Sequence, residues 1–159
     1  MASPDPEPVL RTAVGADAPQ LLRLARSAYA RYVERMGREP RPMADDYAAV
    51  VAEWNVTVAE LDGEVVGLLV CGVSEEYGGF AIDNVAIAPG LQGTGLGRRL
   101  LERGEERGRA GGHSEVRLLT HETMTENLAL YSRIGYVEYD RRPAGEFDLV
   151  YMRKPLTPG

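Results

Sequence analysis

The sequence predicts one domain of mixed α/β (α+β) class, with a central, mostly antiparallel sheet of about six to seven strands and helices on both faces. Three observations predict this class. The 159 residues are enough for one hydrophobic core, and 44% of them are hydrophobic, as in a soluble globular protein. Short apolar runs joined by tight turns occupy the middle of the chain. A strand–helix–strand unit follows these runs, so we expect a mixed sheet.

The expected order of elements is β-α-α-β-β-β-α-β-α-β-β, with no internal repeat and no second domain. Residues 9–155 are expected to form the domain. Residues 1–8 are acidic and proline-rich and are expected to be a disordered lead. Residues 156–159 are expected to be a short tail.

The first half of the chain carries two helix signals and one hairpin signal. Asp17 is expected to cap a helix whose apolar residues recur at helical spacing until Gly37 ends it. Asp45 or Asp46 is expected to begin a second, shorter helix, and Asp62-Gly63 is a strong two-residue hairpin turn. This second helix is expected to run to about Glu53. Strands are expected at residues 9–13, 56–61 and 64–73.

The second half alternates strands with helices. Pro89 ends a strand, Gly111-Gly112 breaks a helix, and Thr125 is expected to cap another helix that runs to Ile134 and stops at Gly135. The expected elements are strands at residues 80–87, 116–120, 136–140 and 147–153 and helices at residues 96–110 and 125–134.

Composition excludes several function classes. The net charge of −6 argues against binding nucleic acid or an anionic membrane surface. The apolar run at residues 65–73 is too short to span a bilayer, and residues 1–8 do not resemble a secretory signal, so we expect a cytoplasmic protein. Cys71 is the single cysteine and is expected to be buried and inert. His113, His121 and Cys71 lack metal-ligand spacing, so no metal is expected.

The most informative stretch is a glycine-rich turn between a strand and a helix, at residues 85–101. Backbone N–H groups at a helix start point outward where the helix dipole is positive, so such a turn binds anions. Arg98-Arg99 follows Gly97 where a P-loop needs a lysine and a serine or threonine. A dinucleotide fingerprint, Gly-x-Gly-x-x-Gly, needs a third glycine. That position is not a glycine, whether the motif starts at Gly93 or at Gly95.

This turn resembles the coenzyme A loop of the GCN5-related N-acetyltransferase (GNAT) family, Gln/Arg-x-x-Gly-x-Gly/Ala, through Gln92, Gly95 and Gly97. The resemblance implies the GNAT fold, acetyl-CoA as acyl donor, and a loop whose backbone amides hold its pyrophosphate. It also implies that the preceding strand end binds the pantetheine arm and polarises the thioester carbonyl. The residues so implied are Val85, Ala86, Ile87, Gln92, Gly93, Thr94, Gly95, Leu96, Gly97 and Arg98.

A second stretch is similar to the same family's signature Asn-x-x-Ala/Leu-x-x-Tyr-x-x-x-Gly-Phe/Tyr. Asn127, Tyr131, Gly135 and Tyr136 fall in place. Asn127 and Tyr131 are four residues apart and share one helical face. The resemblance implies that Asn127 hydrogen-bonds the pantetheine arm and that Tyr131 is the general acid beside the thioester sulfur.

The general base is harder to predict. Many relatives use a glutamate on or beside the strand before the loop, but residues 80–87 contain none. Asp83 is the nearest carboxylate, and His121, with an ordinary pKa near 6.5, is a second candidate. Family members bind the acceptor mainly with the first two helices and their loop. The expected substrate-binding residues are Tyr29, Tyr32, Arg35, Met43, Tyr47, Asn84 and His121, and Arg38 is a further cation that could bind an acidic group.

These observations favour an enzyme that moves an acetyl group from acetyl-CoA to a primary amine by direct attack in a ternary complex. A small-molecule acceptor is slightly favoured over a protein N-terminus or lysine, because the region around the first two helices is rich in tyrosine. The alternative is a catalytically weak module that binds or senses acyl-CoA. The sequence leaves open a preference for longer acyl groups and the formation of a homodimer.

Overall fold

The computed structural model describes residues 6–157, which form one twisted, seven-stranded sheet with the strand order β1-β2-β3-β4-β5-β7-β6. Only the pair β4–β5 is parallel among the strands described. The strands are β1 (Val9–Thr12), β2 (Asn55–Leu61), β3 (Glu64–Ser74), β4 (Gly79–Ile87), β5 (Glu115–His121), β6 (Val137–Ala144) and β7 (Phe147–Pro155).

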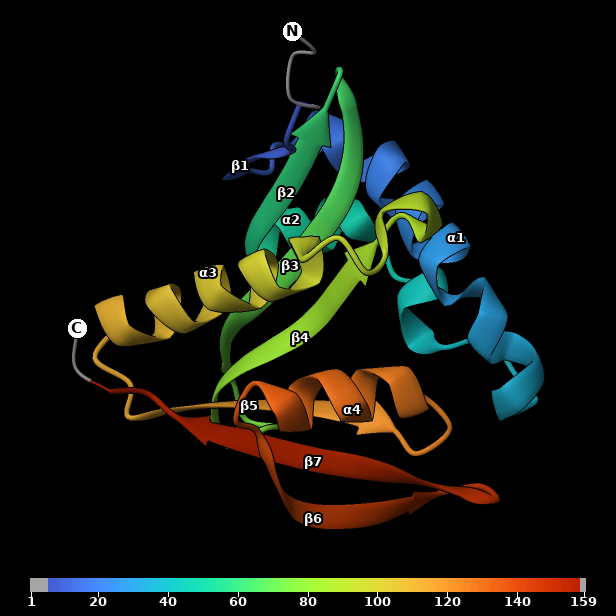
Figure 1. Ribbon diagram of the computed structural model, residues 1–159, viewed down its shortest axis with the longest axis vertical. Coiled ribbons are helices and arrows are strands. Elements are labelled where there is room, and N and C mark those ends of the chain that lie inside the picture. Colours follow the sequence, from blue (N-terminus) through green and yellow to red (C-terminus); the bar gives the residue numbers. More distant parts are fainter. Residues whose placement is uncertain (1–5, 158–159) are drawn as a thin grey trace, which may run out of the picture.

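Helices cover both faces of the sheet. Figure 1 shows α3 and α4 in front of the strands and α1 along the right side of the molecule. A core beneath α1 and α2 includes Leu21 and Leu68, whereas Leu100 and Val150 belong to the core beneath α3 and α4. The expected fold class and element order are therefore confirmed. The helices are α1 (Ala18–Met36), α2 (Tyr47–Glu53), α3 (Leu96–Ala110) and α4 (Thr125–Arg133), and short 3-10 turns lie at Gly15–Asp17, Arg41–Met43 and Pro89–Leu91.

Two expected helix caps are wrong. The side chain of Asp17 makes no capping hydrogen bond to α1; it accepts from Val14 N at 2.8 Å and pairs with Arg11 at 2.9 Å. Thr125 is the first residue of α4, Met124 stands at the cap position, and no side chain caps the helix. A nearby guanidinium is a stronger partner for a carboxylate than a helix amide, and sequence spacing did not reveal it.

The last two strands are longer than expected, since β6 continues through Pro143 to Ala144. Proline is tolerated there because β6 is the edge strand of the sheet. Within residues 6–157, no helix is both long and apolar enough to cross a membrane.

The sheet opens between β4 and β5. In the described chain these strands pair at two positions, Ala81 with Arg117 and Ile82 with Leu118, although β4 continues to Ile87. A bulge precedes the opening, because Val70 pairs with Asn84 and Cys71 with Ile82, which leaves Asp83 without an opposite residue. The separated strand ends leave room for a site in the middle of the molecule.

Candidate active site

Two hollows lie on either side of the opening between β4 and β5, and they meet there. The larger, which we call the glycine-loop groove, has a volume of about 530 Å³, and the smaller, the Arg41 cavity, about 230 Å³. Four residues line both hollows: Tyr29, Val85, Asn127 and Tyr131. We call these four residues the junction. The two hollows are therefore adjacent at these four residues.

The glycine-loop groove is lined on one side by the turn that opens α3. Gly93 and Gly95 have φ angles of +81° and +91°, a region that other residues rarely adopt. The first hydrogen bond of the helix runs from Arg99 N to Gly95 O. Within the described chain the amides from Gly95 to Arg98 have no acceptor, and a Cβ built on Gly93 or Gly95 meets no atom within 4 Å. Open space beside free amides fits a phosphate group.

The groove brings together most of the residues that the resemblance implied. Thr94 and Leu96 are the exceptions, since Thr94 Oγ1 donates to Leu91 O at 2.6 Å and Leu96 is buried in the core. Tyr32, expected to bind the substrate, lines the groove and not the cavity. The implied residues that line the groove are Val85, Ala86, Ile87, Gln92, Gly93, Gly95, Gly97, Arg98, Asn127 and Tyr131.

Helix α4 supplies the polar side chains of the junction. The amide nitrogen of Asn127 lies 3.6 Å from the sulfur of Met124. Tyr131 is buried with its ring 5.9 Å from that of Tyr136, and its hydroxyl has no partner in the part of the chain that the structure describes. Burial raises the pKa of Tyr131 well above its ordinary value, so the phenol stays protonated and can donate a hydrogen bond into the hollow.

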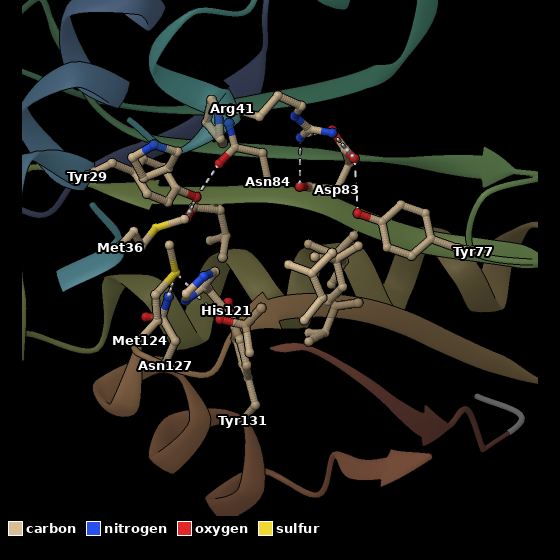
Figure 2. Close-up of a pocket in the computed structure, with 18 of the residues that line it drawn as sticks. Tyr29, Met36, Arg41, Tyr77, Asp83, Asn84, His121, Met124, Asn127 and Tyr131 are labelled. Atoms are coloured by element: carbon tan, nitrogen blue, oxygen red, sulfur yellow. Dashed lines mark hydrogen bonds and ion pairs between the residues drawn. The ribbon is translucent and has the colours of Figure 1, made fainter. Parts of the chain in front are cut away.

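An ion-paired network forms one wall of the Arg41 cavity (Figure 2). The Asp83 carboxylate accepts from Arg41 Nη2 at 2.8 Å and Nη1 at 3.2 Å, and from the Tyr77 hydroxyl at 3.1 Å. Arg41 also pairs with Asp45 at 3.4 Å. The carboxylate oxygens of Asp83 are occupied by Arg41 and Tyr77, and this pairing favours a role in shaping the wall. Sequence reasoning missed Arg41 and Tyr77.

A second network fixes the floor between α1, α2 and β4. Tyr29 donates to Asn84 Oδ1 at 2.7 Å, and Val85 O lies 3.2 Å from the same hydroxyl. The Asn84 amide donates to the Tyr47 hydroxyl at 3.2 Å, and Tyr47 donates to Pro42 O at 2.6 Å. Tyr29 and Asn84 line the cavity, whereas Tyr47 does not and holds the loop from beneath.

His121 lines the cavity from the end of β5, and its hydrogen bonds fix its tautomer. Thr123 N donates to Nδ1 at 3.3 Å, and Thr123 Oγ1 lies 2.7 Å from the same nitrogen. Because a backbone N–H can only donate, Nδ1 accepts and the proton of the neutral ring is on Nε2. Burial and then the charge of Arg38 lower the pKa of His121. His121 is therefore arranged as a donor toward the cavity, which disfavours the expected base role.

Three expected substrate-binding residues line neither hollow: Tyr47, Arg35 and Met43. Arg35 is held by Glu126 through two 2.8 Å hydrogen bonds, which join α1 to α4. Met43 is buried in the core beneath α1.

Cys71 is fully buried in the core beneath α3, as expected, and burial raises the pKa of its thiol to about 11. Residues 6–157 contain no group of three or more His, Cys, Asp or Glu side chains arranged to hold a metal ion.

Comparison with known proteins gives a consistent result. The acetyltransferase (GNAT) family profile matches residues 20–136. An "IAA acetyltransferase" of Azospirillum brasilense is 35% identical over 103 residues, which span 62% of this chain and 66% of the relative, just under two thirds of its length.

Solved structures resemble the fold. The PaiA N-acetyltransferase of Thermoplasma acidophilum in complex with coenzyme A has a TM-score of 0.80 at 15% identity, over 94% of this chain and 99% of that one. The YncA structure of Salmonella typhimurium with acetyl-CoA has a TM-score of 0.71 at 20% identity, over 96% of this chain and 95% of that one.

Proposed function

Because this chain belongs to the acetyltransferase (GNAT) family, we propose that it transfers an acetyl group from acetyl-CoA directly to a primary amine, with a small molecule as the preferred acceptor. One observation carries the proposal: the glycine-loop groove and the Arg41 cavity meet at Tyr29, Val85, Asn127 and Tyr131. Residues 9–155 act as the single catalytic domain in this proposal.

The acetyl donor is assigned to the groove. The free amides from Gly95 to Arg98 would bind its pyrophosphate, and Arg98 adds a positive charge at the same helix start. Backbone groups from Val85 to Ile87 and the Asn127 amide would bind the pantetheine arm. Bound acetyl-CoA supplies a thioester, whose carbonyl carbon the amine attacks.

Tyr131 would assist the leaving sulfur. Its buried phenol is protonated and unpartnered within the described chain, so it can donate a hydrogen bond to the thiolate that develops. A thiol has an ordinary pKa of about 8.5, so a proton already held by the buried phenol would stay shared or follow late. Stabilisation by a hydrogen bond therefore accounts better for its role than complete early proton transfer.

The attacking nitrogen must lose a proton. For a lysine-like amine at pH 7 this costs about 4–5 kcal/mol. The four residues of the junction include no carboxylate and no imidazole. Because Asp83 is paired with Arg41 and His121 presents a donor, we propose that water in the cavity carries this proton away.

Direct transfer is favoured over a covalent acetyl-enzyme. Cys71 is buried in the core and lines neither hollow, and its raised pKa keeps it a thiol. A small acceptor is favoured because the cavity is about 230 Å³ in volume and its Arg41 wall is tied to β4.

Calorimetric titration with acetyl-CoA, coenzyme A and a longer acyl-CoA tests the donor half of this proposal. We expect micromolar or tighter binding of acetyl-CoA, about −8 kcal/mol. Thiol release measured over a panel of primary amines tests the acceptor half. Absence of acetyl-CoA binding would overturn the proposal, whereas binding without transfer to any amine would indicate an acyl-CoA-binding module.

A further inference from the structure

Arg38 is the cation of the Arg41 cavity that has no acidic partner. It follows the left-handed Gly37 that ends α1, is exposed, and lines the cavity. Arg41, the other arginine of the lining, is paired with Asp83 and Asp45. Among the described residues, Arg38 makes no ion pair and no side-chain hydrogen bond, so its guanidinium is available to a bound molecule.

His121 adds a second donor close to this cation. Its Nδ1 is occupied by Thr123, so Nε2 carries the proton of the neutral ring. Nε2 has no hydrogen-bond partner within residues 6–157. It is nevertheless not fully buried, because it is absent from the set of inaccessible side-chain atoms without a partner. It therefore keeps contact with the cavity that the residue lines. Arg38 lines the same cavity as His121, and its charge adds to burial in lowering the pKa of His121.

The acidic groups of the cavity do not neutralise this pair of donors. Asp83 is held by Arg41 and Tyr77. Glu76 precedes Tyr77 on the turn between β3 and β4, and Figure 2 shows Tyr77 and Asp83 across the cavity from His121. An anion would therefore find a guanidinium and an imidazole N–H on one side of the cavity.

Met124 connects this side of the cavity to the junction. Met124 N donates to His121 O at 2.9 Å, and the Met124 sulfur contacts the Asn127 amide at 3.6 Å. Figure 2 shows His121, Met124 and Asn127 together. A molecule whose anionic group sits at His121 can thus place a nearby nitrogen at the junction. Apolar side chains such as Leu118 and Leu149 line the cavity too and would contact the rest of the molecule.

We propose that the acceptor is an amino acid, or another small amine with a carboxylate close to the nitrogen, and that Arg38 and Nε2 of His121 bind this carboxylate. The inference rests on the proposed function and adds a substrate class to it. The carboxylate is recognised by a charge-assisted hydrogen bond from Arg38 and one from the imidazole. Both residues are binding residues, and neither takes part in the transfer itself.

Matched substrate pairs test the proposal. Amino acids and their carboxamides differ in the charge and one atom of the group that Arg38 and His121 would bind, and the accompanying difference in amine basicity is the same for every variant. We expect the wild-type enzyme to acetylate several acids with a kcat/KM at least about tenfold above that of their amides, through a lower KM. Arg38→Gln should reduce this acid-over-amide preference about ten- to hundredfold, and Arg38→Lys should restore part of it.

Two further variants sharpen the test. His121→Asn keeps an N–H donor but not its position, so the preference should fall, by less than in Arg38→Gln. Arg23 is an exposed arginine of α1 that lines neither hollow. The variant Arg23→Gln should therefore keep the acid-over-amide preference of the wild type. A circular dichroism spectrum and melting curve confirm that each variant is folded.

Three results would overturn the inference: amides acetylated as well as acids, a preference that survives Arg38→Gln, or no carboxylate-bearing amine acetylated while acetyl-CoA binds. The proposed function fails separately, when acetyl-CoA itself does not bind. Transfer to neutral amines alone would keep the acetyltransferase activity and discard the carboxylate site.

Discussion

The glycine-loop groove and the Arg41 cavity meet at four residues, yet backbone groups form one side of the groove and side chains form the wall of the cavity. One side of the groove consists of backbone amides at the start of α3, exposed by a turn that needs glycine at Gly93 and Gly95. The wall of the cavity consists of side chains from separate segments, held by the Arg41–Asp83 pair. Binding by backbone depends on conformation, whereas binding by side chains depends on pairs that the fold brings together.

The largest effect is expected at the junction, where the two hollows meet. Tyr131→Phe removes the donor to the leaving sulfur but keeps the ring, so kcat should fall about 10²- to 10⁴-fold. The dissociation constant of acetyl-CoA should change less than about threefold, because the loop amides are unchanged and the ring of residue 131 is kept. Steady-state thiol release and calorimetry measure the two quantities.

Tyr136→Phe is the matched control. Its ring packs on that of Tyr131, and its hydroxyl is buried without a partner among residues 6–157, so removal of the hydroxyl should leave kcat nearly unchanged. Equal losses in the two variants would show that packing of the rings matters and that the Tyr131 hydroxyl does not.

The next effect separates the groove from the cavity. Gly95→Val forces a branched side chain into a φ of +91° beside the free amides, so acetyl-CoA affinity should weaken about ten- to hundredfold. Gly90→Ala, in the same loop but without positive φ and with open space around its Cβ, should bind normally. Unchanged acetyl-CoA affinity in Gly95→Val would contradict the proposal that the backbone amides of this turn bind the pyrophosphate.

The reverse separation uses Arg41→Gln. The side chain of Asp83 is 8% exposed and would lose its cation, whereas that of Arg41 is 51% exposed, so we expect a loss of about 1–2 kcal/mol in the free energy of unfolding. The acceptor KM should rise several-fold, to about tenfold, while acetyl-CoA binds as before. Urea denaturation and kinetics measure this; weaker acetyl-CoA binding with normal acceptor KM would contradict the division.

The smallest effect is a pH dependence that belongs to the cavity alone. Burial and Arg38 lower the pKa of His121 below its ordinary value near 6.5, so the unfolded chain binds a proton first as pH falls. The free energy of unfolding should therefore decrease below about pH 6.5, with a slope under about 1.36 kcal/mol per pH unit. Urea denaturation of the wild type and His121→Asn at several pH values should show this slope in the wild type alone; equal slopes would contradict it.

Much of the fold could be predicted from the sequence because its signals are local. The apolar period of α1 up to Gly37, the Asp62-Gly63 turn and the limits of α3 all depend on neighbouring residues. The Asp17 cap failed because its partner Arg11 lies on another element, and local spacing cannot rank a guanidinium against an amide.

The site divides along the same line. The groove depends in part on glycine spacing, and the two short motifs together with the strand before the loop indicated half of its lining residues. The cavity depends on contacts between residues far apart in the chain, such as Arg41 with Asp83 and Tyr29 with Asn84. Some residues of suitable type in the first two helices and their loop were therefore predicted to bind the substrate, although they do not line the cavity. Arg35 and Met43 are the clearest cases, since an ion pair and the core hold them elsewhere.

The most direct test of the account is an initial-velocity experiment in which acetyl-CoA and an accepted amine are varied together. If donor and acceptor occupy the joined hollows at the same time, double-reciprocal plots will intersect. Parallel lines, the pattern of a covalent acetyl-enzyme, would contradict direct transfer across the junction of Tyr29, Val85, Asn127 and Tyr131.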